Sequence, residues 1–219
     1  MLYNTQALFL HYPKTAGKSA SLYFCKNFRK PIYGMVSKGQ FAEINMNEQD
    51  GVFLTEGRGH ENLHYSEKKL AEKGQSIRDL EHIIVVTRNP YDLMVSNYFF
   101  LKQQFRKNTK MREKPNFILA AENDFSGFCE KFQPADFRNW VELDNKKPQN
   151  LHLLRFETLE DDFRKILKQS GLTERHRLQT LNKSIRPAAS EMYDSTSKKH
   201  VDEKFDALFY YGEYEKRLV

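Results

Sequence analysis

Four short apolar runs divide the chain, and we predict that each is a buried β-strand. They cover Ala7–His11, Val52–Thr55, His82–Thr87 and Leu151–Phe156. Most are nearly continuous in apolar residues, which is typical of parallel strands that helices cover on both faces. We therefore expect the four runs to lie in one sheet.

Longer segments repeat their apolar residues at helical spacing. One runs from Pro90 to about Phe105, with the proline in the first turn, where a helix tolerates it. Another covers Glu157–Ser170 and is followed by Gly171, a common residue after the end of a helix. Weaker patterns predict helices at Ala20–Phe28, Ser66–Lys73, Asn116–Glu122, Phe125–Phe132, Glu174–Leu181 and Lys198–Tyr210.

Strands that alternate with helices indicate an α/β fold with a central, mostly parallel sheet flanked by helices. The chain has 219 residues and contains no internal repeat, low-complexity tract or clear linker, so we expect a single domain over residues 1–219. The least regular parts are residues 38–51 and 182–197, which we expect to be loops.

Composition narrows the class of protein. Apolar residues make up 39% and aromatic residues 13%, enough for a packed core, and the formal net charge of +6 favours anionic partners. Two cysteines without metal-ligand spacing exclude a disulfide scaffold and favour a reducing compartment. Neither a secretory leader nor a membrane-length apolar run is present, so we expect a cytoplasmic protein if Met1 is the native start.

The segment His11-Tyr-Pro-Lys-Thr-Ala-Gly-Lys-Ser19 lies between a predicted strand and a predicted helix. A loop of this kind binds phosphate, because backbone N–H groups at the helix start point at the anion and lysines add charge. The candidate anion ligands are Lys14, Thr15, Ala16, Gly17, Lys18 and Ser19.

This loop departs from the nucleotide-binding motif Gly-x-x-x-x-Gly-Lys-Ser/Thr, since Tyr12 stands where the first glycine belongs. A P-loop kinase using ATP and Mg²⁺ is still an alternative, with Glu56 as the acid that would hold the metal. It is disfavoured because the strand at residues 83–86 runs into Thr87-Arg88 rather than into an acid.

A second strand, turn and helix carries Thr87-Arg-Asn-Pro-Tyr-Asp92 and continues to Ser96. Arg88 follows the carboxyl end of its strand, where open α/β sheets bind their ligands. Ser96 could reach the same anion if the helix packs alongside it. The plainer interpretation is an arginine that pairs with Asp92.

The two motifs together resemble those of sulfotransferases that use 3′-phosphoadenosine 5′-phosphosulfate (PAPS), with carbohydrate-type members the nearest. Residues 13–19 are similar to the family's 5′-phosphosulfate loop, and residues 87–98 are similar to its 3′-phosphate segment. Weaker similarities are Leu153–Leu159 and the tail Phe205–Gly212. The resemblance implies a P-loop-NTPase-like three-layer sandwich.

The resemblance also implies a reaction: transfer of a sulfuryl group from PAPS to an acceptor hydroxyl, leaving adenosine 3′,5′-bisphosphate, with no metal. Lys14 would stabilise the leaving phosphate. Gly59-His60 is similar to the segment that bears the catalytic base in some carbohydrate sulfotransferases, and histidine is the commonest general base. Glu56 is the alternative base. Arg186, and after it Lys183, would close over the nucleotide from a late loop.

The acceptor is the least determined partner. The resemblance favours a sugar hydroxyl. The basic stretch Leu101–Lys114 could hold an anionic glycan, although such runs are more often solvated surface. A basic nucleic-acid-binding module is a further alternative, which the lack of recognisable nucleic-acid motifs disfavours. The sequence leaves the oligomeric state open.

Overall fold

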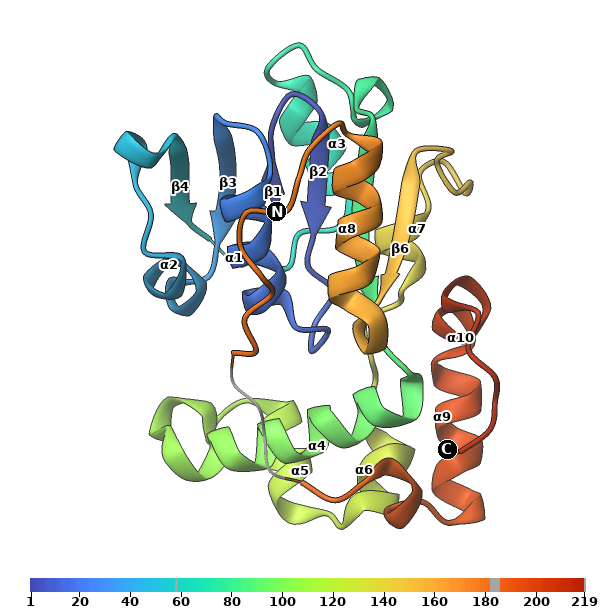
Figure 1. The fold of residues 1–219 in the computed structure, drawn as a ribbon. Coiled ribbons are helices and arrows are strands. Elements are labelled where there is room, and N and C mark those ends of the chain that lie inside the picture. Colours follow the sequence, from blue (N-terminus) through green and yellow to red (C-terminus); the bar gives the residue numbers. More distant parts are fainter. Residues whose placement is uncertain (58, 182–185, 219) are drawn as a thin grey trace. The chain divides into compact units, whose positions relative to one another are not determined.

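A six-stranded mixed sheet forms the centre of the computed structural model, which describes residues 1–57, 59–181 and 186–218. The strand order is β4-β3-β1-β2-β5-β6 (Figure 1). The strands are β1 Leu2–Tyr3, β2 Ala7–Leu10, β3 Ile32–Val36, β4 Val52–Glu56, β5 His82–Thr87 and β6 Leu151–Arg155.

The pairing confirms the prediction of a mostly parallel sheet. β2 pairs in parallel with β5, β5 with β6, and β3 with β4, whereas the two-residue β1 runs antiparallel to both of its neighbours. The sequence pattern missed β1, which is too short to show a period, and β3, whose apolar residues alternate around Gly34. Because β2 and β5 are adjacent and parallel, their carboxyl ends lie at the same edge of the sheet.

The chain forms two compact units, each described here by itself. Unit 1 comprises Met1–Thr87 and Arg138–Leu181 and contains the sheet. Figure 1 shows α1 and α8 over one face of the sheet, with α3 and α7 on the other. The helices of this unit are α1 Gly17–Asn27, α2 Lys38–Ile44, α3 Leu63–Ala71, α7 Arg138–Val141 and α8 Leu159–Gln169, with 3-10 turns at Glu48–Asp50, Ile77–Asp79 and Phe156–Thr158.

An aromatic core fixes α1 and α8 against the sheet. Phe9 of β2, Phe24 of α1 and Phe163 of α8 are each at most 1% exposed, and their rings pack together. Burial of large apolar rings of this kind supplies most of the stabilisation of a layer interface. The core therefore fixes the start of α1 at the carboxyl end of β2.

Unit 2 comprises Arg88–Phe137 and Asn182–Val219 and is helical in its described residues. Aromatic rings of Tyr98, Phe125 and Phe128 pack at its centre. The ammonium of Lys204 donates to the carbonyls of Cys129 and Phe132 at the end of α6. The helices are α4 Pro90–Lys107, α5 Pro115–Glu122, α6 Phe125–Lys131, α9 Ser195–Lys204 and α10 Asp206–Gly212, with 3-10 turns at Thr109–Met111 and Ala189–Glu191.

Two expectations about local structure were wrong. Glu174–Leu181 is irregular rather than helical, because Oδ1 of Asn27 accepts the backbone N–H groups of Arg175 and His176. Conversely, residues 38–51 contain α2, whose start is held by a reciprocal cap between Ser37 and Gln40.

The predicted helix at residues 198–210 starts at Ser195 and is divided at Phe205 between α9 and α10. The single-domain organisation stays a prediction. Over the described residues, no helix has the length and apolar content needed to cross a membrane.

Candidate active site

The loop of residues 11–19, the anion loop, leaves β2 through an unusual backbone. Lys14 has φ 65° and Ala16 has φ 59°, so two non-glycine residues adopt the left-handed region within three positions. Such conformations are strained and occur where surrounding structure or function requires them. Kinks of this kind turn successive backbone N–H groups toward one concavity, which suits an anion.

The anion loop ends at the N-terminus of α1, where Ala16 is the N-cap and supplies no side-chain cap. Backbone N–H groups of the first turn are thus left for a ligand, and no acidic residue lies in that turn. The hydroxyl of the fully buried Thr15 donates to the carbonyl of Tyr12 at 2.8 Å and braces the loop.

The side chains of Lys18 and Ser19 have partners within unit 1. The Lys18 ammonium lies 2.8 Å from the Glu43 carboxylate on α2. The Ser19 hydroxyl oxygen accepts the backbone N–H of Leu181 at 3.0 Å. Their predicted role in anion binding therefore depends on their backbone N–H groups at the helix start.

Gly17 is required by a neighbouring ring. A Cβ at this position would lie 1.8 Å from Nε2 of His11, so only glycine lets the imidazole cover the start of α1. The structure shows His11 packed on the anion loop.

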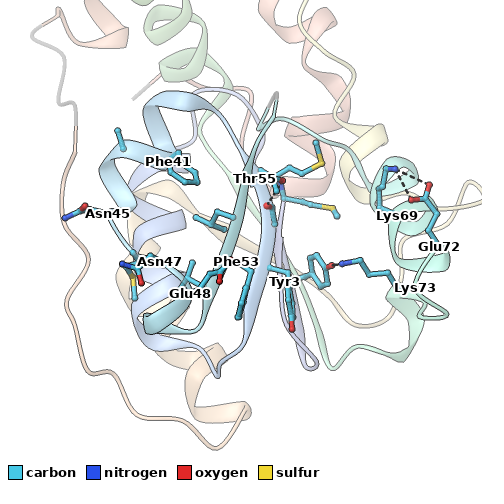
Figure 2. Close-up of a pocket in the computed structure, with 18 residues that line it drawn as sticks. Tyr3, Phe41, Asn45, Asn47, Glu48, Phe53, Thr55, Lys69, Glu72 and Lys73 are labelled. Carbon is cyan, nitrogen blue, oxygen red and sulfur yellow. Dashed lines mark hydrogen bonds and ion pairs between the residues drawn. The ribbon is translucent and has the colours of Figure 1, made fainter.

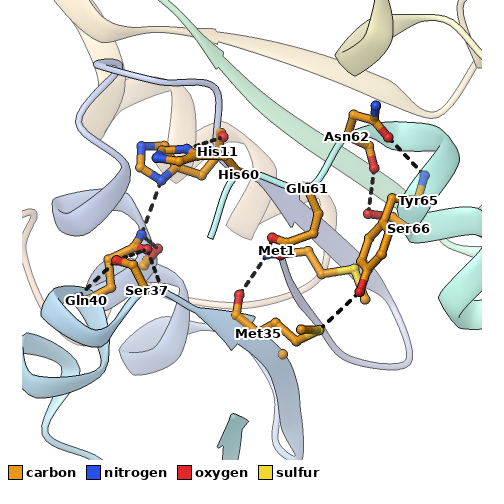
Figure 3. Close-up of polar contacts among 12 residues, drawn as sticks. Met1, His11, Met35, Ser37, Gln40, His60, Glu61, Asn62, Tyr65 and Ser66 are labelled. Atoms are coloured by element: carbon orange, nitrogen blue, oxygen red, sulfur yellow. Dashed lines mark hydrogen bonds and ion pairs between the residues drawn. The ribbon is translucent and has the colours of Figure 1, made fainter. Parts of the chain in front are cut away.

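A second imidazole completes this region, that of His60 (Figure 3). Its Nδ1 lies 3.2 Å from the carbonyl oxygen of His11, and the two ring centroids are 4.4 Å apart. A carbonyl only accepts, so Nδ1 of His60 carries the proton and Nε2 keeps the lone pair of the neutral ring. Among the described residues no polar group bonds to that Nε2.

The surrounding protein lowers the pKa of both histidines, although the His60 side chain is still exposed. Desolvation is the main cause for each, and the charges of Lys14 and of the Met1 amino group act in the same direction. The pKa of His11 falls well below its ordinary value, and the neighbouring His60 contributes to this shift. His60 is therefore neutral at pH 7, the form a general base needs.

Glu56, the alternative base, is the last residue of β4 and is exposed. It pairs in register with Val36 on the neighbouring strand. In the chain, Glu56 precedes His60 by four residues.

Unit 2 contains a separate group of charged residues, the arginine cluster, made of Arg88, Asp92, Ser96 and Arg186. Nε of Arg88 donates to Asp92 at 2.7 Å and its Nη1 lies 3.4 Å from the hydroxyl of Ser96. Arg186 donates to the other oxygen of Asp92. Arg88 is 8% exposed. Two predicted anion ligands, Arg88 and Arg186, thus share one carboxylate, and the third, Ser96, contacts Arg88. Lys183 lies outside the described residues.

The end of β5 lacks the acid that a P-loop kinase needs. Thr87 is fully buried and its hydroxyl donates to the carbonyl of Leu154 at 3.2 Å. Within the described part of the chain, no group of three histidine, cysteine or carboxylate side chains could hold a metal ion.

A hollow of about 720 Å³ opens along β4, the edge strand (Figure 2). The rings of Tyr3, Tyr33 and Phe53 line it in register across three strands, with Tyr33 and Phe53 stacked at 5.2 Å. The ammonium of Lys73 lies 5.2 Å from the centroid of each tyrosine ring. Sequence reasoning missed this hollow because its aromatic residues come from β1 and β3, the two unpredicted strands, and from β4.

Sequence reasoning also missed Gln40, whose amide nitrogen lies 3.2 Å from Nδ1 of His11. This residue lies in a segment that was expected to be a loop. Trp140 is 6% exposed and packs edge-on against Tyr12. The only signal for His11 was its position at the end of a predicted strand, immediately before the anion-binding segment.

Comparison with known proteins gives a partial domain match and a shared fold. A family model for the sulfotransferase domain matches residues 69–171. No curated protein sequence matches the chain. Among solved structures, the chain is similar to mouse sulfotransferase SULT7A1 complexed with PAP, with 15% identity and a TM-score of 0.54 over 96% of this chain and 89% of that one. The chain therefore matches the sulfotransferase domain over residues 69–171 and shares the fold of that structure.

Proposed function

We propose that the enzyme transfers a sulfuryl group from PAPS to an acceptor hydroxyl and releases adenosine 3′,5′-bisphosphate. The observation that carries this proposal is the left-handed backbone at Lys14 and Ala16, which leads into an uncapped helix start beside a neutral His60. The similar mouse structure is complexed with PAP, which supports the choice of nucleotide.

Each unit contains one group of residues that suits an anionic end of this donor. The 5′-phosphosulfate would bind the anion loop, through backbone N–H groups of residues 15–19 and the ammonium of Lys14. The 3′-phosphate would bind Arg88, Ser96 and Arg186, where two guanidinium groups and a hydroxyl converge. Lys183 and Lys18 are secondary candidates for these contacts.

Three residues would perform the chemistry. Nε2 of His60 would accept the proton of the acceptor hydroxyl as its oxygen attacks sulfur. Lys14 would stabilise the charge that develops on the leaving 5′-phosphate, as preorganised cations do in displacement reactions. Glu56 would replace His60 as base in the alternative assignment. The donor supplies an activated sulfuryl group, and we infer that no metal is needed.

For the acceptor we propose a carbohydrate or glycoconjugate. Pyranose rings stack on aromatic faces, and the hollow along β4 offers Tyr3, Tyr33 and Phe53 with Lys73 beside them. Met1 at its margin bonds through its amino group to Glu61, the residue after His60. The hollow and His60 both belong to unit 1, and Lys73 would suit an anionic sugar.

We also propose that the protein acts in the cytoplasm as a single 219-residue domain without a nucleic-acid partner. Cys25 and Cys129 are buried free thiols, as expected in a reducing compartment. The basic composition is accounted for by the proposed nucleotide contacts.

Calorimetric titration combined with a sulfate-transfer assay tests the proposal. We expect adenosine 3′,5′-bisphosphate to bind more tightly than ATP with Mg²⁺. His60→Ala should lower turnover by roughly 100-fold or more while retaining bisphosphate binding. Arg88→Ala should weaken bisphosphate binding roughly 10- to 100-fold, more than Lys14→Ala does.

Arg78→Ala is the matched control, because Arg78 forms an exposed pair with Asp144 away from the proposed ligands and should leave binding and turnover unchanged. Tighter binding of ATP with Mg²⁺ would favour the kinase instead. Normal turnover in His60→Ala would move the role of base to Glu56.

A further inference from the structure

A chain of hydrogen bonds leads from the start of α2 to the proposed base (Figure 3). The backbone N–H of Ser37 lies 3.2 Å from Oε1 of Gln40, and the Ser37 hydroxyl lies 3.0 Å from the same oxygen. A backbone N–H only donates, so the amide oxygen of Gln40 must face Ser37. The amide nitrogen of Gln40 is thereby turned toward His11.

The orientation of Gln40 sets the protonation of His11. Nε2 of Gln40 lies 3.2 Å from Nδ1 of His11 and 3.2 Å from the hydroxyl of Ser21. An amide nitrogen only donates, so Nδ1 of His11 must accept, and the neutral ring carries its proton on Nε2. The ring also bonds to the backbone of Gly59, a bond that raises the pKa of His11, as donation to a carbonyl does.

Gly59 allows the two histidine segments to pack closely against Gln40. Its φ of 75° lies in the left-handed region, and a Cβ there would come within 2.6 Å of Oε1 of Gln40. The residue after it, His60, donates through Nδ1 to the carbonyl of His11 and packs against the His11 ring. The positions of both rings are therefore coupled to the amide of Gln40.

We propose that Gln40 and His11 are positioning residues for His60, an inference that rests on the proposed role of His60 as the base. The carbonyl of His11 selects the tautomer that leaves Nε2 of His60 able to accept a proton. Burial keeps the His11 ring neutral, and Gln40 fixes which of its nitrogens carries the proton. A neutral ring 4.4 Å away does not repel the imidazolium that forms when His60 takes the proton of the acceptor.

The charged groups around His11 and His60 set the direction in which the pKa of each ring shifts. Lys14 and the Met1 amino group lower the pKa of His60, and Glu61 raises it. Lys14, the Met1 amino group and His60 lower the pKa of His11. A second proton on His11 would add another positive charge to this set and weaken His60 as a base.

Gln40→Glu tests the inference with an almost isosteric change. Glutamate suits the same capping position, since it also accepts from the backbone of Ser37. It cannot donate, so Nδ1 of His11 would have to donate to it while the other nitrogen stays bonded to Gly59. We expect the pKa of both histidines to rise, that of His11 by about one unit and that of His60 by less, because the new carboxylate contacts His11 directly.

Two measurements read this out. Nuclear magnetic resonance titration of the imidazole nitrogens should show His60 protonated on Nδ1 in the parent enzyme, and the two upward pKa shifts in Gln40→Glu. The acid limb of the pH profile of kcat should move to higher pH with the pKa of His60, and the plateau kcat should fall about 10-fold because a changed His11 tautomer disturbs the contact that positions His60. Bisphosphate affinity should change less than threefold.

Gln49→Glu is the matched control, because it adds the same charge at an exposed position in a 3-10 turn and should shift neither histidine. Unchanged histidine pKa values in Gln40→Glu, or a shift of equal size in Gln49→Glu, would overturn the inference. Coupled titration in a protein whose His60→Ala variant keeps full turnover would instead remove the proposed base and leave the coupling of the rings intact.

Discussion

The anion loop of unit 1 and the arginine cluster of unit 2 prepare for negative charge in different ways. The loop relies on its backbone: left-handed residues at Lys14 and Ala16 and an uncapped helix start, closed over by a neutral imidazole. The cluster relies on side chains: Arg88 and Arg186 share the carboxylate of Asp92. One region stores backbone strain, and the other holds charges close together.

The difference determines how each region should fail. A strained loop that is packed against a ring tolerates no added volume, because the neighbouring atoms cannot withdraw. A cluster of mostly buried charges tolerates volume better but requires its charges to balance. Steric substitutions should therefore damage the loop most, and substitutions that change charge should damage the cluster most.

Gly17→Ala should have the largest effect. The new Cβ would overlap Nε2 of His11 at 1.8 Å, so the ring or the start of α1 must move. We expect a loss of about 3 kcal/mol in the free energy of unfolding. We also expect a loss of bisphosphate binding of at least about 30-fold, because the backbone N–H groups lose their alignment. Urea unfolding and calorimetry measure the two effects.

Gly39→Ala provides the matched comparison. Gly39 lies inside α2, and a Cβ there would meet only the end of the Lys18 side chain, at 3.4 Å. Alanine favours a helix, so this variant should be equal to or more stable than the parent protein, by up to about 1 kcal/mol. Equal losses in Gly17→Ala and Gly39→Ala would show that the His11 contact does not decide the outcome.

The arginine cluster should respond to Asp92→Asn. This change conserves volume but leaves Arg88 and Arg186 without their shared carboxylate, while Arg88 stays 8% exposed. We expect a loss of about 2–3 kcal/mol in the free energy of unfolding. Bound bisphosphate should restore more of the melting temperature than it adds to the parent protein, because the anion supplies the missing charge.

Asp144→Asn serves as the control, since its pair with Arg78 is exposed on both sides and should contribute less than about 1 kcal/mol. Thermal melts with and without ligand give the comparison. A variant of Asp92 that melts like the parent protein would show that the two guanidinium groups do not need that carboxylate.

Periodicity predicted the elements that bury continuous apolar faces. β2, β4, β5 and β6 and helices such as α4 and α8 begin and end within a few residues of their expected bounds. β1 consists of only two residues, and its place depends on pairing with β2 and β3, which a local pattern does not contain. The helix predicted at residues 174–181 is absent for the same kind of reason. Asn27, from a distant part of the chain, accepts hydrogen bonds from two backbone N–H groups of this segment.

The candidate site divides in a similar way. Contiguous motifs identified the anion loop and Arg88 with Ser96, because both accompany strand ends followed by helices. They gave no sign of Gln40, which reaches His11 only because α2 packs there, or of the contact between Gly17 and His11. Residue identity shows what a side chain can do, while tertiary contacts decide its protonation state.

The smallest effect, and a further way to separate the two regions, is the pH dependence of stability. The pKa of His11 is well below its ordinary value in the folded protein, whereas an unfolded histidine titrates near about 6.5. Between these values the unfolded chain binds the proton and the folded chain does not, so stability is full above the unfolded pKa and falls as pH drops. His11 should account for up to about 1.4 kcal/mol per pH unit.

Urea unfolding between pH 7.5 and 5.5 measures this dependence in the parent protein and in His11→Phe, which keeps a ring but takes up no proton. The variant will be less stable at pH 7.5, because Gln40 loses its acceptor, but its stability should fall less steeply with pH. His60, His82 and His152 have lowered pKa values as well, so part of the slope should persist. His64→Gln, an exposed change on α3, should keep the full slope. If His11→Phe keeps the full slope too, the imidazole beside the anion loop takes up no proton on unfolding in this range, and the loop is not linked to pH through that ring.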